Sequence, residues 1–152
     1  MNYLIIFLLT FSLGTHLFAQ KSNFPKVVNV AQNSAILEDL STIYKGSLFS
    51  ASNADFIKTT KNWHQVLIGL EKYSEKIDFD LKGVKIWIKV FFAKDGNIEH
   101  ITYILAETSI NIDTIELEAF LRSFMKNYKL PESHEQNFSY DARIQFPLYL
   151  MR

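Results

Sequence analysis

The chain has 152 residues, of which 48% are hydrophobic and 14% aromatic, a composition typical of one folded globular domain. Its 16 basic and 16 acidic residues give a formal net charge of zero, so no long-range field favours nucleic acid or an anionic membrane as a partner. The absence of cysteine excludes structural disulfides, cysteine-ligated zinc and a thiol nucleophile.

Residues 1–19 have the pattern of a secretory signal peptide. The stretch from Tyr3 to Leu13 is almost continuously apolar, and the Ala19-Gln20 step fits a cleavage point. An uncleaved anchor is the alternative, but the apolar run of about 16 residues is shorter than the roughly 20 that a membrane span needs. We therefore expect an exported protein, periplasmic or extracellular, with no stable membrane span after cleavage.

Residues 20–53 are predicted to form an N-terminal lead-in with one short helix. Between residues 34 and 45 the apolar side chains fall on a single helical face, and Gly46 stands where a helix C-cap is expected. Residues 47–53 are rich in serine and small residues, which favours a loop.

A long helix is predicted within residues 54–80, with Asn53 as its N-cap. Gly69 would weaken such a helix, and either a close contact with the sheet or simple tolerance would explain it. The apolar stripe of this helix recurs mostly at three- and four-residue spacings: Trp63, Val66, Leu67, Leu70, Tyr73 and Ile77.

The clearest signal in the chain is a β-hairpin over residues 84–106. Two alternating apolar segments flank the Asp95-Gly96 step, which favours a tight turn, and Asp95 is interpreted as a turn residue rather than a catalyst. One face of the hairpin is apolar, whereas the other is mixed and carries Trp87, Phe91 and Ile104. This mixed face has too much apolar area for a fully solvated surface, so we expect either cover by the protein itself or an interaction surface.

Two further elements complete the predicted main domain, residues 54–152. A second long helix is expected within residues 109–129, beginning with a capping box at Asp113. A final strand at residues 138–148 alternates apolar and polar residues, and Pro147 suits a sheet edge or a strand end. The order helix, hairpin, helix, strand predicts the α+β class.

Three segments carry a resemblance to a known family: VKIWIKVFFAKDGNIEHI, then a helix ending in NYKLP, then FSYDARIQFPL. In their order and spacing these segments resemble the C-terminal domain of TonB-family proteins, over about residues 62–150. The resemblance implies an antiparallel three-stranded sheet, made of the β-hairpin plus the C-terminal strand. Two long helices would pack on one face of this sheet, with the short N-terminal helix in addition.

The resemblance also implies how the protein would act. Domains of this family bind partner peptides of the cell envelope by strand addition, which would make residues 138–148 the contact strand, with Phe138, Tyr140, Arg143 and Phe146 as its candidate contact residues. The mixed hairpin face adds Trp87 and Phe91 as candidates. The chain lacks a long proline-rich spacer and the alanine pair of the family's helix, so we expect a binding module and not an energy transducer.

No pattern of catalytic or metal-ligating residues emerges from the sequence. It contains no G-x-S-x-G elbow and no glycine-rich phosphate loop, and its histidines show no helical pair or His-x-His motif. We therefore predict a non-enzymatic protein without a cofactor or metal. One alternative is a small-molecule-binding or hydrolytic α+β domain of cystatin-like or NTF2-like type, and another is an envelope protein that forms a homodimer through Trp87 and Phe91. The four histidines are His16, His64, His100 and His134.

Overall fold

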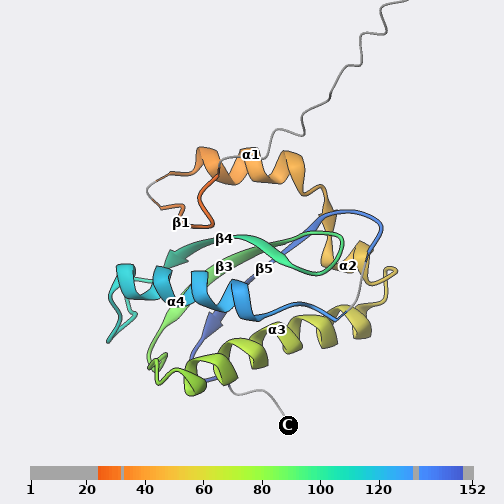
Figure 1. Cartoon of the computed structure of the whole chain (residues 1–152). Helices are drawn as coiled ribbons and strands as arrows, with labels where there is room; N and C mark the ends of the chain where they lie inside the picture. The colour runs from red at the N-terminus through yellow and green to blue at the C-terminus, as the bar shows by residue number, and fades with distance from the viewer. Residues whose placement is uncertain (1–23, 32, 132–133, 149–152) are drawn as a thin grey trace, which may run out of the picture.

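The computed structural model describes residues 24–31, 33–131 and 134–148, so the predicted signal peptide at residues 1–19 lies outside the described residues. Five strands form one mixed sheet in the order β1-β4-β3-β5-β2 (Figure 1). The elements in chain order are β1 (Val27–Asn29), α1 (Ala35–Ile43), β2 (Gly46–Ser47), α2 (Leu48–Ala51), α3 (Phe56–Lys76), β3 (Lys85–Phe92), β4 (Ile98–Leu105), α4 (Thr114–Asn127) and β5 (Phe138–Gln145).

The α+β class is confirmed, but the antiparallel three-stranded sheet is wrong. Strands β3, β4 and β5 do pair antiparallel with β3 in the centre. Two short strands of the lead-in then extend this sheet in parallel, β1 beside β4 and β2 beside β5. The sheet is therefore five-stranded and mixed. The two additional strands were not predicted, because segments of three and two residues are too short to show the alternation by which a strand is recognised.

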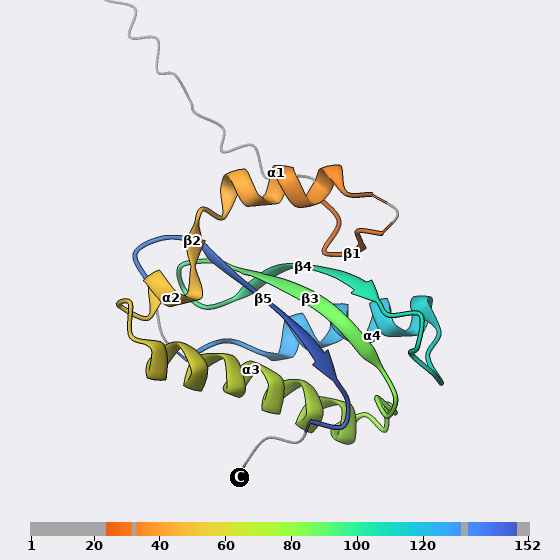
Figure 2. The ribbon, with the colours of Figure 1, turned by 180° about the vertical axis from the view of Figure 1, so that it is seen from behind.

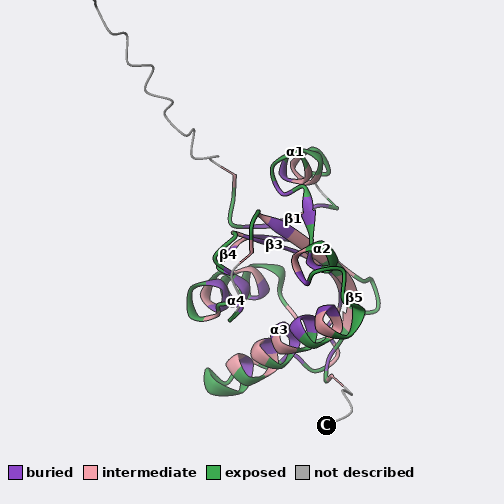
Figure 3. Cartoon of the chain, turned by 90° about the vertical axis from the view of Figure 1, so that its right-hand side faces the viewer, coloured by how far each residue is buried: buried purple, intermediate pink, exposed green. Residues whose placement is uncertain are grey.

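The sheet lies between two layers of helices. Helices α3 and α4 cover one face, whereas α1 lies over the other (Figure 2). The main hydrophobic core fills the space between the sheet and the α3–α4 layer, and the buried sides of these two helices face the sheet (Figure 3). Large side chains that form this core include Trp63, Leu67 and Leu70 of α3, Ile88 and Val90 of β3, and Phe120 and Phe124 of α4.

The helix starts show where local chemistry was predicted correctly and where it was not. Asp113 is the N-cap of α4, as expected, and its carboxylate accepts hydrogen bonds from the backbone of the first turn. Helix α3 is instead capped by Asp55, whose carboxylate accepts from the N–H of Lys58 at 3.0 Å. Asn53 has a φ of 60° and lies in the preceding turn. The predicted loop after Gly46 contains the short helix α2.

The β3–β4 hairpin is confirmed, and its turn is built as predicted. Gly96 has a φ of 86°, a conformation that residues with a side chain rarely adopt. The Asp95 carboxylate accepts hydrogen bonds from the backbone N–H of Asn97 at 3.1 Å and from its side-chain amide at 2.7 Å. Asp95 therefore stabilises the turn.

Candidate functional site

The outer edge of β5 is only partly covered. In β2, Gly46 pairs with Phe138 and Ser47 with Ser139, after which the chain continues into α2. From Tyr140 to Gln145, β5 has no strand on its outer side among the described residues (Figure 2). The last strand is therefore paired at its beginning and open along the rest of its length.

Along this open part, alternate residues direct their backbone groups away from the sheet. The N–H of Phe146 donates to the carbonyl of Val84 at 2.9 Å, so the backbone groups of Phe146 face β3. Because this direction alternates along an antiparallel strand, the N–H and C=O groups of Asp141, Arg143 and Gln145 point outward. Unpaired backbone groups of this kind are a template for an additional strand.

The helix-facing side chains of the open edge are incompletely buried. Tyr140, Ala142 and Ile144 are each half-buried, although Tyr140 packs against the Trp63 ring with centroids 4.9 Å apart. A further strand beside β5 would remove this remaining apolar surface from water, which is favourable. The corresponding row on the central strand β3 is 4% exposed or less: Ile86, Ile88 and Val90.

The opposite face of the sheet is covered at one end by α1. Leu40 and Tyr44 pack against Phe91, and these three side chains form a second, smaller hydrophobic cluster. The Tyr44 hydroxyl donates to the Glu99 carboxylate at 2.5 Å. Burial and this carboxylate raise the pKa of Tyr44 well above its usual range, so Tyr44 remains a donor. The protein itself therefore covers Phe91.

The other end of this face is open and reaches the free edge. Trp87 is half-buried and its indole N–H donates to Asp141 Oδ2 at 3.2 Å. In the sheet register Trp87 lies between Ile104 on β4 and Arg143 on β5. Ile104 is 41% exposed and Arg143 is exposed. We call Trp87, Ile104 and Arg143 the open patch.

The structure separates the six predicted contact residues into two groups. Phe91, Phe138 and Phe146 are 4% exposed or less, so their side chains stabilise the fold and cannot contact a partner. Tyr140, Trp87 and Arg143 lie at the free edge or in the open patch. Ile104 was placed on the mixed face of the hairpin but was not named as a contact residue. Asp141 and Gln145 lie in the predicted contact strand but were not named either, because the free edge at these residues depends on the shortness of β2, for which no sequence motif exists.

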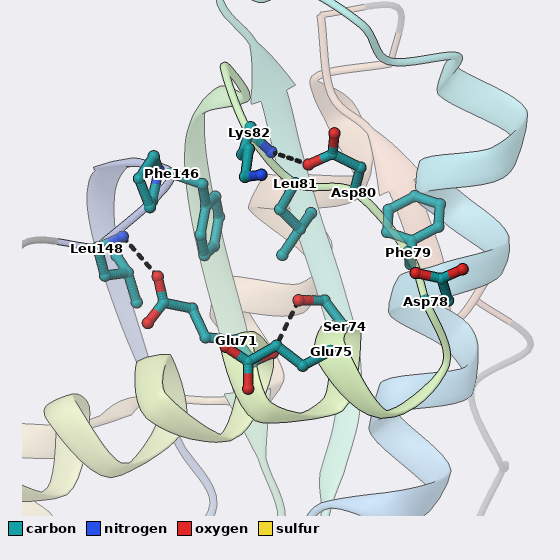
Figure 4. A pocket seen from close by; sticks show the side chains of 11 residues that line it. Glu71, Ser74, Glu75, Asp78, Phe79, Asp80, Leu81, Lys82, Phe146 and Leu148 are labelled. Atoms are coloured by element: carbon teal, nitrogen blue, oxygen red, sulfur yellow. Dashed lines mark hydrogen bonds between the residues drawn. The ribbon is translucent and has the colours of Figure 1, made fainter.

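A separate hollow of about 450 Å³ lies at the C-terminal end of α3 (Figure 4). Two of its carboxylates accept hydrogen bonds from nearby backbone N–H groups. Glu71 accepts one from Leu148 at 2.5 Å, and Asp80 accepts one from Lys82 at 2.8 Å. Within the described part of the chain, no group of histidine and acidic side chains could hold a metal ion. The acidic side chains around this hollow are Glu71, Glu75, Asp78 and Asp80.

None of the helices in the described ranges is long and apolar enough to cross a membrane. Comparison with protein-family models, with curated proteins and with solved structures found no significant match for this chain. The candidate site therefore rests on the geometry of β5 and the open patch.

Proposed function

We propose that this protein is an exported, non-enzymatic module that binds a protein or peptide of the cell envelope by adding a strand to β5. The observation that supports this function is the open edge from Asp141 to Gln145, with its outward backbone groups and its half-buried apolar row. A partner strand would pair with these groups and bury this row. Export follows from the signal-peptide pattern of residues 1–19, and the resemblance to the TonB C-terminal domain favours the same mode of binding.

The main competing explanation is that the edge of β5 binds no partner and is only protected against pairing with another copy of the chain. Charged side chains on an edge strand, such as Asp141 and Arg143 on β5, also prevent self-association. Protection does not account for the open patch, in which apolar surface stays in water at Trp87, on the strand next to β5, and at Ile104, one strand further in. Exposed aromatic and apolar surface next to an unpaired edge is typical of a binding site.

The edge can be tested with a single proline. Arg143→Pro removes an N–H that points away from β3, so the ladder inside the protein keeps its hydrogen bonds. Arg143→Gln is the matched control, because it removes the same charge but keeps the N–H. We expect a partner recovered from envelope extract by the intact chain to be recovered at least about tenfold less well by Arg143→Pro than by Arg143→Gln, which corresponds to about 1.4 kcal/mol.

Hydrogen exchange gives the second readout, since amides at residues 141–145 should exchange more slowly once the partner is bound. Equal recovery by the proline and glutamine variants, with unchanged exchange at this edge, would exclude strand addition. If Arg143→Pro does not fold, Gln145→Pro with Gln145→Ala as its control probes the same outward-facing edge.

A further inference from the structure

We infer that the segment bound by β5 is acidic, and that it places an aspartate or glutamate opposite Arg143 on the side of the open patch. This inference rests on the strand addition proposed above and concerns the chemistry of the partner. It follows from the charges around the open patch and from the direction of the side chains on an added strand.

The open side of the sheet has a local excess of positive charge, although the whole chain is neutral. Lys85, Lys89 and Arg143 all lie on this side, and none of them makes an ion pair among the described residues. Lys89 lies over the Phe91 ring, with its amine 5.6 Å from the ring centroid. Three cations on one small face favour an anionic ligand.

Two carboxylates, Asp141 and Glu99, also lie on this side and keep their negative charge, because their hydrogen-bond donors are neutral, so the three cations leave an excess of one positive charge. In the sheet register Asp141 lies opposite Lys89. Asp141 accepts the hydrogen bond from the Trp87 indole at 3.2 Å. Glu99, the acidic residue of β4, accepts the hydrogen bond from Tyr44 beneath α1. Arg143 is exposed at the edge and is therefore the cation best placed to meet a carboxylate of a partner.

An added strand would present its side chains alternately to the two faces of the sheet. On one face they would lie beside Asp141, Arg143 and Gln145, and on the other beside the half-buried row that includes Ala142 and Ile144. An acidic residue opposite Arg143 forms a favourable cross-strand pair, whereas a basic residue there is repelled. The partner is thus a short strand that alternates apolar residues with polar ones and carries a carboxylate at its centre.

Single-stranded nucleic acid also binds faces that combine cations with an aromatic ring. A nucleic acid would leave the outward N–H and C=O groups of β5 unpaired and would not bury its half-buried apolar row. The peptide uses both features of the edge, and for this reason we favour it.

The test compares two labelled peptides that differ at one position. The acidic probe is amidated Thr-Val-Thr-Val-Glu-Val-Thr-Val, and the basic probe has lysine in place of glutamate. Fluorescence anisotropy with the chain beginning at Gln20 should show about five- to tenfold tighter binding of the acidic probe at about 10 mM salt. The difference should narrow at about 150 mM salt, because screening weakens exposed charge pairs.

Charge reversal identifies the residue responsible. Arg143→Glu should reverse the preference between the two probes, and Arg143→Gln should abolish it. Lys126→Glu is the matched control, since it changes the net charge equally at an exposed position of α4 and should leave the preference intact.

The outcomes separate the two proposals. Equal binding of both probes, with slower exchange at residues 141–145, overturns the acidic partner but leaves strand addition in place. Binding of neither probe up to about 1 mM, with unchanged exchange, overturns both. Tighter binding of a short labelled oligothymidylate than of the acidic probe overturns the inference in favour of nucleic acid.

Discussion

At the scale of single residues, His100 is the buried group with the clearest expected effect on stability. It is 3% exposed, and its Nδ1 lies 3.0 Å from the carbonyl oxygen of Pro25, so Nδ1 carries the hydrogen of this bond. The rings of Phe24 and Tyr44 contact it edge-on. Burial has the largest effect and lowers the pKa of His100, although the hydrogen bond to Pro25 opposes this shift. Of its charged neighbours, Lys26 lowers the pKa further and Glu99 raises it.

This environment predicts that the protein loses stability in mild acid. Well above a pH of about 6.5 His100 is neutral in both the folded and the unfolded chain and contributes nothing to the pH dependence. As the pH falls below this value the unfolded chain takes up the proton first, because the folded pKa is lower. The free energy of unfolding should therefore fall, with a slope of at most about 1.4 kcal/mol per pH unit, until the folded pKa is passed.

Urea unfolding at pH values between about 7.5 and about 5.5 measures this dependence. His100→Gln should remove most of the loss. The control His64→Gln, on the exposed side of α3, leaves the cluster around His100 untouched and should preserve the loss. A pH dependence that survives unchanged in His100→Gln would show that another group is responsible.

At the scale of secondary-structure elements, Gly69 sets how closely α3 and α4 approach. A Cβ atom at this position would lie 2.6 Å from Cε2 of Tyr128, a separation that real Cβ contacts do not show. The Tyr128 ring is stacked on Phe124, with centroids 5.0 Å apart, so it cannot easily move aside. The close contact considered from the sequence is real, but its partner is the end of α4 and not the sheet.

We therefore expect Gly69→Ala to destabilise the protein, although alanine is the better helix former by up to about 1 kcal/mol. The overlap with Tyr128 should cost more than this gain, for a net loss of about 1 to 2 kcal/mol. In a Tyr128→Ala background the same substitution should become stabilising. A double-mutant cycle from denaturant unfolding measures both effects, and a stabilising Gly69→Ala in the intact chain would contradict the contact.

The elements also show what could be predicted from the sequence. The long elements have enough residues to display a helical or strand period, so the hydrophobic pattern of the sequence predicts them: α3, α4, β3, β4 and β5. The short strands β1 and β2 owe their existence to pairing partners that are distant in the chain. Such long-range pairing leaves no local period, so the five-stranded sheet could not be derived.

The candidate site was only partly predictable for a similar reason. The alternation along β5 places Phe138, Tyr140 and Phe146 on its apolar side, but it does not distinguish the buried Phe138 and Phe146 from the half-buried Tyr140. The cover over Phe91 depends on where α1 packs, which periodicity does not specify. The free edge at Arg143 depends on where β2 ends.

At the scale of the whole molecule, the lead-in is part of the fold. It supplies both outer strands of the sheet and the helix that covers Phe91. Six of its apolar side chains are 9% exposed or less: Val27, Val28, Val30, Leu40, Tyr44 and Leu48. At roughly 1.5 to 3 kcal/mol for each fully buried side chain, their loss would remove on the order of 10 kcal/mol, which is comparable to the whole stability of a typical domain.

A chain that begins at Ala54 should therefore fail to fold cooperatively, even though it contains every element of the predicted three-stranded domain. Without β1 and α1 it would expose the face around Phe91, and without β2 the edge of β5 would be open along its full length. Thermal unfolding followed by near-ultraviolet circular dichroism should show a sharp transition for the chain beginning at Gln20 and none for the shorter chain. A sharp transition in the shorter chain would mean that the three central strands with α3 and α4 are sufficient, and that the lead-in only modifies a core that is stable without it.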